Sequence, residues 1–287
     1  GADTAFSSSS DRSYAQHDSC AQAATRYRAM REFQVWSDEL WALLLQFSPR
    51  FVIGFENPVQ GMLVDDIRST YEEAMASLTE RGWITSDPDS PGQLHTSIAD
   101  EIRTIANARH VVLLVHPADS GEANVTSFHF AGGRIVQLTA NPNDTYAIRS
   151  LQAGSEAIRE EVFLILGPIS QEQRDTLCIS QDVFSKVQET PIEDSRCWER
   201  FETQGTSRQA LTQFHKAVRC PSARLSLLSF RNLGTTDQAR VDGFALLSSE
   251  DAVWLLETLG DENSLVQATT MSQAELTQRL AVVLPEE

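Results

Sequence analysis

Six histidines are the first side chains of this 287-residue chain to consider for metal binding or general base chemistry. They are His17, His95, His110, His116, His129 and His215. His116 and His129 lie on segments predicted to be neighbouring strands, so their rings are the pair most able to approach each other. A metal site needs at least a third ligand, and no Asp, Glu or Cys is placed by the sequence to supply it. We therefore expect no metal and no cofactor, and interpret the histidines as surface or hydrogen-bonded side chains.

Four cysteines are the candidate nucleophiles, at Cys20, Cys178, Cys197 and Cys220. None forms a C-x-x-C pair or has a histidine at zinc-ligand spacing. Cys178 stands between Leu177 and Ile179 in a segment expected to be helical, and this apolar setting favours a buried, unreactive thiol over a nucleophile. Widely spaced free thiols are typical of a reducing compartment.

Paired carboxylates could supply acid and base catalysis, and three pairs occur, at Asp65-Asp66, Glu72-Glu73 and Glu160-Glu161. All three fall on predicted helices, where acidic pairs usually form the solvated face. The chain has no G-x-G-x-x-G, P-loop, G-x-S-x-G or H-E-x-x-H motif. Gly132-Gly133 lies between two predicted strands, which indicates a hairpin rather than a phosphate-binding loop. We expect no catalytic or cofactor-binding residue, and a protein that is not an enzyme.

Composition and charge restrict the classes of partner. Hydrophobic residues make up 41% and charged residues 22%, as in a folded globular protein. The formal net charge of −17 disfavours binding to nucleic acid or to an anionic membrane. No stretch of 18 apolar residues occurs, and residues 1–12 lack the basic and apolar regions of a signal peptide. We expect a cytoplasmic protein.

Apolar periodicity predicts the elements that would position these side chains. Ser37 is the expected N-cap of a helix that ends near Ser48, and Ile98, Ile102 and Ile105 recur at helical spacing. Helices are predicted over 21–33 (peripheral), 64–81, 96–108 and 154–166. Strands are predicted over 50–55, 110–116, 124–130, 134–139 and 145–151. Gly82 is expected to end the helix over 64–81.

The second half of the chain repeats this order of elements. Residues 253–284 align with 135–166 without a gap at an offset of 118. Upstream, an offset of 114 places Leu113 on Leu227 and Phe130 on Phe244. The match indicates an internal duplication, although two segments with the same order of elements would also share apolar positions by convergence.

The expected fold is α+β, internally duplicated and pseudo-two-fold, with an antiparallel sheet flanked by helices. Each half contributes a four-stranded meander, and one continuous sheet would hide a strand edge of each half. The expected division is residues 1–33 as a tail with a peripheral helix, 34–166 as the first αβ repeat and 167–287 as the second.

This order of elements resembles the EspG family, the cytosolic chaperones of type VII secretion. The resemblance covers roughly residues 34–285, from the helix that ends in Leu78-x-x-x-Gly82 to the closing helix of the second half. It implies a quasi-two-fold αβ fold and a protein partner, such as a helical client that is kept soluble before export. It implies contacts through surface loops and the sheet region, and it transfers no individual binding residue.

Three functions are compatible with these observations. The preferred one is a non-enzymatic protein-binding module, a cytosolic chaperone or adaptor. The second is a small-ligand binder or enzyme with a site between the two repeats, where His116 and His129 would lie. The third is a winged-helix-like regulator, although the helix over 96–108 carries Arg103 as its single basic residue, beside Asp100 and Glu101.

Overall fold

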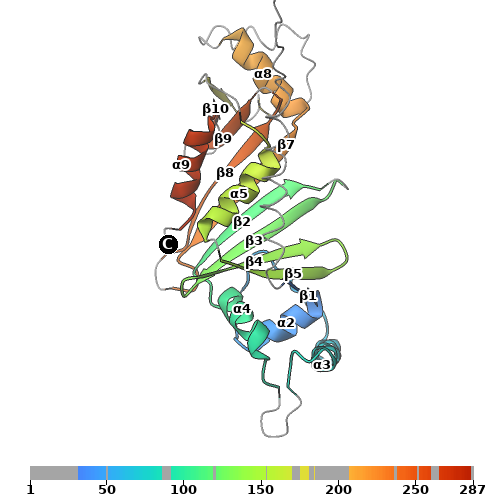
Figure 1. The fold of residues 1–287 in the computed structure, drawn as a ribbon. Helices are drawn as coiled ribbons and strands as arrows, with labels where there is room; N and C mark the ends of the chain where they lie inside the picture. Colours follow the sequence, from blue (N-terminus) through green and yellow to red (C-terminus); the bar gives the residue numbers. More distant parts are fainter. Residues whose placement is uncertain are drawn as a thin grey trace, which may run out of the picture.

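One ten-stranded antiparallel sheet runs the length of the molecule, which is seen in a computed structural model (Figure 1). The structure describes residues 32–49, 51–85, 92–118, 121–152, 154–169, 175–180, 184, 207–235, 238–250, 252–259 and 265–285. The strand order is β1-β5-β4-β3-β2-β7-β8-β9-β10-β6. The strands are β1 (Glu32–Trp36), β2 (His110–Pro117), β3 (Ala123–Ala131), β4 (Arg134–Asn141), β5 (Thr145–Leu151), β6 (Thr176–Ser180), β7 (Ala223–Arg231), β8 (Arg240–Ser248), β9 (Val253–Leu259) and β10 (Leu265–Thr270).

Helices cover both faces of this sheet. They are α2 (Ser37–Leu45), α3 (Val64–Glu80), α4 (Thr96–Ala106), α5 (Ser155–Leu166), α8 (Arg208–Arg219) and α9 (Gln273–Val283). On one face, α5 and α9 pack over a central cluster to which both halves contribute, including Phe128, Ile158, Leu227 and Leu276. The fold is α+β, as expected.

The opposite face carries two separate clusters. Beneath the first half, α2 and α4 pack Leu40, Ile98 and Ile102 against the sheet, and α3 lies outside them. Beneath the second half, α8 packs Phe214 against Trp254. We refer to these as the first and second outer clusters. Each amphipathic helix thus buries one stripe of apolar side chains, as its spacing predicts.

The two halves have the same topology within this sheet. At each outer edge of the sheet lies the first strand of one half, β1 or β6. The four strands of that half's meander follow toward the centre, from the last to the first. The first meander strands, β2 and β7, therefore pair with each other in the middle. The offset of 118 keeps each side chain on its face: Ile135 and Val253 both lie in the central cluster, as do Ile158 and Leu276. The common topology is observed; the origin of one half from the other stays a prediction.

The offset of 114 is wrong by one position on the central strands. Leu114 lies opposite Leu227 in the β2–β7 ladder, and both belong to the central cluster. Because side chains alternate along a strand, Leu113 points to the other face. An alignment of Leu113 with Leu227 therefore joins residues from opposite faces, a distinction that apolar character alone does not reveal.

The edge strand β1 and the loop over 51–54 differ from the elements that the sequence predicts. Glu32 and Phe33, expected at the end of a peripheral helix, begin β1, which pairs with β5; the rest of that helix lies outside the described residues. Residues 51–54 form a loop rather than a strand. The reason is Gly54, whose φ of +80° leaves the extended region. The divisions at 33/34 and 166/167 stay a prediction, and β1 spans the first of them.

The cysteine expectation was also wrong. Cys178 lies on β6, not on a helix, and it is exposed, as is Cys220. Leu177 and Ile179 face the second outer cluster, so the alternation of a strand turns Cys178 outward. Cys20 and Cys197 lie outside the described residues.

Candidate functional site

The two histidines expected to approach each other lie on neighbouring strands but do not share a site. In the β2–β3 ladder His116 lies opposite Asn124, whereas His129 lies opposite Val111, at the other end of the strand pair. His116 is on the same face as Leu114, and His129 is on the face opposite Phe128. Within the described residues, no group of three His, Cys, Asp or Glu side chains is placed to hold a metal ion.

Two serine–histidine contacts appear instead, one partly buried and one buried. His110 Nε2 lies 2.8 Å from Ser229 Oγ across the junction of the halves, and His129 Nε2 lies 2.9 Å from Ser127 Oγ. Both serines are fully buried, so neither hydroxyl can reach a substrate. Neither ring has a carboxylate partner in the described part of the chain to orient it, as a catalytic triad requires. These contacts are structural.

Burial keeps both rings neutral. It lowers the pKa of His129 to about 3, and burial together with the nearby Arg231 guanidinium lowers the pKa of His110 to about 4. Sequence reasoning did not find the His110–Ser229 contact, because it joins strands that are 119 residues apart.

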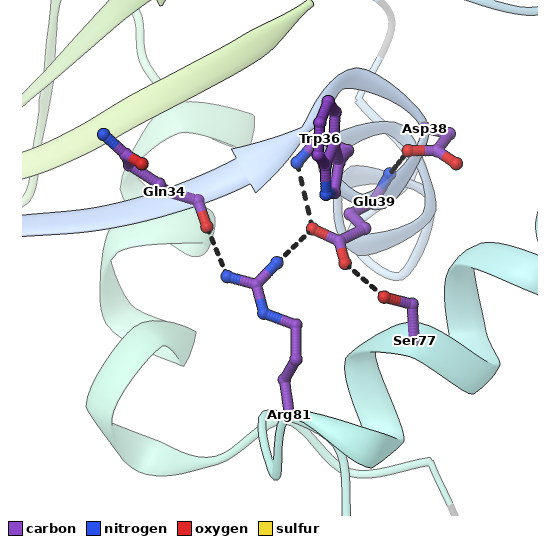
Figure 2. A network of polar contacts seen from close by, with 6 residues as sticks. All are labelled: Gln34, Trp36, Asp38, Glu39, Ser77 and Arg81. Atoms are coloured by element: carbon purple, nitrogen blue, oxygen red, sulfur yellow. Dashed lines mark hydrogen bonds and ion pairs between the residues drawn. The ribbon is translucent and has the colours of Figure 1, made fainter.

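Glu39 forms the most connected polar network of the first half (Figure 2). Its carboxylate is 1% exposed and accepts hydrogen bonds from Trp36 N at 2.9 Å, Ser77 Oγ at 2.7 Å and Arg81 Nη1 at 2.5 Å. Arg81 also donates to the carbonyl of Gln34, so the network ties β1 and α2 to α3. Both of its oxygens accept hydrogen bonds from the protein itself, as in a structural ion pair.

A partly open cavity of about 240 Å³ lies beside His129. Its walls come from the loop after α2, the C-terminal end of α4, strands β2 and β3, and Leu233-Gly234 after β7. The cavity therefore receives residues from both halves of the chain. His129 is among the residues that line it and His116 is not, so a site between the repeats stays a prediction.

Exposed apolar side chains gather where α3 begins. Met62, Leu63 and Val64 are consecutive and are 43%, 75% and 74% exposed. We refer to them as the α3 start segment. The C-terminal half of α3 packs through Ala74 and Leu78, whereas residues 64–66 are exposed. Isolated exposed apolar residues are ordinary, but a contiguous run marks an interaction surface.

The fold is similar to that of a solved structure. A chain of EspG5, the type VII secretion system chaperone of Mycobacterium tuberculosis, superposes with a TM-score of 0.59 over 89% of this chain and 97% of that chain, at 12% sequence identity. The chain shares the fold of EspG5. The similarity to the EspG family expected from the order of elements is thus confirmed as a distant structural one. EspG5 was solved in complex with a PE25–PPE41 dimer.

No protein-family model matches the chain, and no curated protein matches it. Within the described residues, no helix is long and apolar enough to cross a membrane.

Proposed function

We propose that this chain is a non-enzymatic, cytosolic protein-binding module, a chaperone or adaptor that binds a helical client and keeps it soluble before export. The observation that carries the proposal is the fold shared with EspG5 over 89% of the chain, because EspG5 is a chaperone in complex with a protein dimer. Fold alone does not determine function, so the binding surface must be tested on this chain's own residues.

The α3 start segment is the surface that we assign to the client. Leu63 and Val64 are about three-quarters exposed, and burying a large aliphatic side chain contributes about 1.5–3 kcal/mol. An amphipathic client helix laid against this segment would bury both side chains at once.

Charge specifies the client further. Asp65 and Asp66 follow Val64 directly, are exposed and open α3. Together with the net charge of −17, they favour a client whose apolar ridge is flanked by Lys or Arg. The affinity should fall as salt is raised, because exposed charges are screened.

The test is co-expression of the full chain with any small helical exported proteins that are encoded beside it in its native genome. We expect a complex of defined stoichiometry by size-exclusion chromatography with light scattering, and a client that precipitates when expressed alone. Replacing both Leu63 and Val64 with Asp should lower the client affinity at least about tenfold without changing the melting temperature.

Leu164→Asp is the matched control, because Leu164 is 82% exposed on α5, on the opposite face of the sheet. It should leave the client affinity unchanged. A chain that elutes alone with every neighbouring exported protein would overturn the proposed function. Loss of binding in Leu164→Asp alone would retain the function and move the client to the α5–α9 face.

A further inference from the structure

Helix α3 turns an acidic face to solvent. The helix packs on α2 and lies at the outside of the first half (Figure 1). Arg68 is its single basic residue. Its exposed carboxylates belong to Asp65, Asp66, Glu72, Glu73 and Glu80. The α3 start segment adjoins the N-terminal end of this face. The outer surface is therefore apolar at one end and anionic along its length, and a matching occupant needs positive charge beside large apolar side chains.

Residues 12–31 of the same chain have this composition. We refer to them as the arginine segment; they lie outside the described residues. The segment carries a single acidic residue, Asp18, in a protein whose net charge is −17. Its basic residues are Arg12, Arg26, Arg28 and Arg31. Its large apolar side chains are Tyr14, Tyr27 and Met30. The combination of arginines with large apolar side chains is the chemistry that the α3 start segment and its acidic neighbours favour in a client.

The described chain begins beside α3. The carbonyl of Gln34 on β1 accepts a hydrogen bond from Arg81, the residue that follows the last residue of α3. Glu32, where the described chain begins, is therefore two positions from a contact with the C-terminal end of this helix. The 17 residues of α3 extend about 25 Å. Twenty residues span about 30 Å even as a helix and more when extended, so the arginine segment is long enough to follow α3 to the α3 start segment.

We propose that the arginine segment binds to the exposed face of α3 in its own molecule and covers the α3 start segment until the client displaces it. The inference rests on the proposed function, because the surface that it regulates is the one assigned to the client. Exposed ion pairs are individually weak, so the contact depends on the tether. A tethered segment acts at an effective concentration on the order of millimolar, and a dissociation constant of about 0.1 mM would then keep the surface covered for about nine-tenths of the time.

The first experiment observes the α3 start segment in the full chain without a client. Methyl-labelled Leu63 and Val64 report on it by NMR. Replacing Arg26, Arg28 and Arg31 with Gln removes three charges from the arginine segment and should shift both methyl resonances, because their cover is released. Arg240→Gln, a change at an exposed arginine of β8, is the control and should leave both resonances in place. Unchanged resonances in the triple variant would overturn the proposal.

A charge exchange tests whether α3 is the partner of the arginines. Glu72→Arg combined with Glu73→Arg should release the segment and shift the same methyl resonances. Replacing the three arginines with Glu in that variant should return the resonances to their original positions, because the attraction is restored with the signs reversed. Absence of this restoration would overturn α3 as the docking face. Shifts that depend on protein concentration would assign the segment to a second copy and would overturn the contact within one molecule.

The client affinity measures the regulation. A surface that is covered for nine-tenths of the time leaves about one-tenth of the molecules open, so the triple Gln variant should bind the client about 10-fold more tightly than the unaltered chain. Equal affinities would overturn the inference and leave the proposed function intact. A client that binds neither form would overturn the proposed function instead, and the resonances of Leu63 and Val64 then decide by themselves whether the segment contacts α3.

Discussion

Glu39 and His129 are buried polar side chains, and such groups need hydrogen-bond partners in the folded state. Glu39 has three donors from three different places in the chain. His129 has one hydrogen bond and one open position. Glu39 therefore holds several elements of the fold together, whereas the second ring nitrogen of His129 makes no hydrogen bond among the described residues. Substitutions at these two positions should therefore have different consequences.

Removing the Glu39 carboxylate should destabilise the fold strongly. Glu39→Ala leaves Ser77 Oγ, Trp36 N and the Arg81 guanidinium without their acceptor, and breaking a buried pair of this kind costs about 3 kcal/mol. Urea denaturation measures the loss. Glu72→Ala on the exposed side of α3 is the control and should change stability by no more than about 0.5 kcal/mol. Similar losses in the two variants would refute the structural role of Glu39.

Acidification should weaken the fold through His129. Its folded pKa of about 3 lies below the unfolded value near 6.5, so the unfolded chain takes up the proton first. Stability is fully present above about pH 6.5 and is lost as pH falls toward the folded pKa, at up to about 1.4 kcal/mol per pH unit. His110 acts in the same direction. Glu161, whose pKa is raised by burial, acts in the opposite one.

The measurement is the free energy of unfolding at pH 7, 6 and 5. In His129→Phe the dependence on pH should be shallower than in the unaltered chain, by up to about 1.4 kcal/mol per unit. An unchanged slope in His129→Phe would show that this ring does not remain neutral in the folded state.

Among the connecting elements, the loop over 51–55 depends most on one residue. Gly54 has a φ of +80°, and a Cβ placed there would lie 2.4 Å from Ser127 Oγ. Gly61 has a similar φ of +82° with nothing within 4 Å of its Cβ position. Gly61→Ala should cost about 1 kcal/mol from backbone strain alone, and Gly54→Ala at least about 1 kcal/mol more from the contact. Equal melting temperatures would mean that the loop can move away from β3.

The elements that could be predicted from sequence are those with a strong period. The helices at 64–81, 96–108 and 154–166 and all four strands of the first meander lie within two residues of their expected bounds. Each of these helices repeats its apolar residues on one face, and each strand is rich in apolar residues that the sheet buries. Both strands that were missed, β1 and β6, are five-residue strands at the outer edges of the sheet. Five residues give too few repeats of an alternating pattern to distinguish a strand from the end of a helix.

The candidate sites were less predictable than the elements for a different reason. His129 could be assigned to a strand, but its face depends on the register of β3 with β4, which local pattern does not fix. The cavity needs Leu233 and Gly234 beside Ile105 and Val111, residues that are more than 120 positions apart. Such juxtapositions arise from tertiary pairing alone.

At the scale of the whole molecule, the two halves should unfold together. The central cluster takes side chains from β2 to β5 and α5 and also from β7 to β9 and α9. Trp83 packs on the first outer cluster and Trp254 is buried in the second, so each reports on one half. In a chain labelled with fluorotryptophan, both resonances should lose their folded intensity at the same urea concentration. Loss of the Trp254 signal before that of Trp83 would indicate two independent domains.

The β2–β7 ladder has a consequence for cleavage of the chain. Five register pairs and the central cluster join the halves, whereas the polypeptide passes from one half to the other once, between α5 and β6. A protease site introduced between Gly167 and Asp175 would therefore yield two fragments that stay assembled. They would migrate as one species on a native gel and separate only in detergent, and two genes encoding the fragments would reconstitute the protein in one cell.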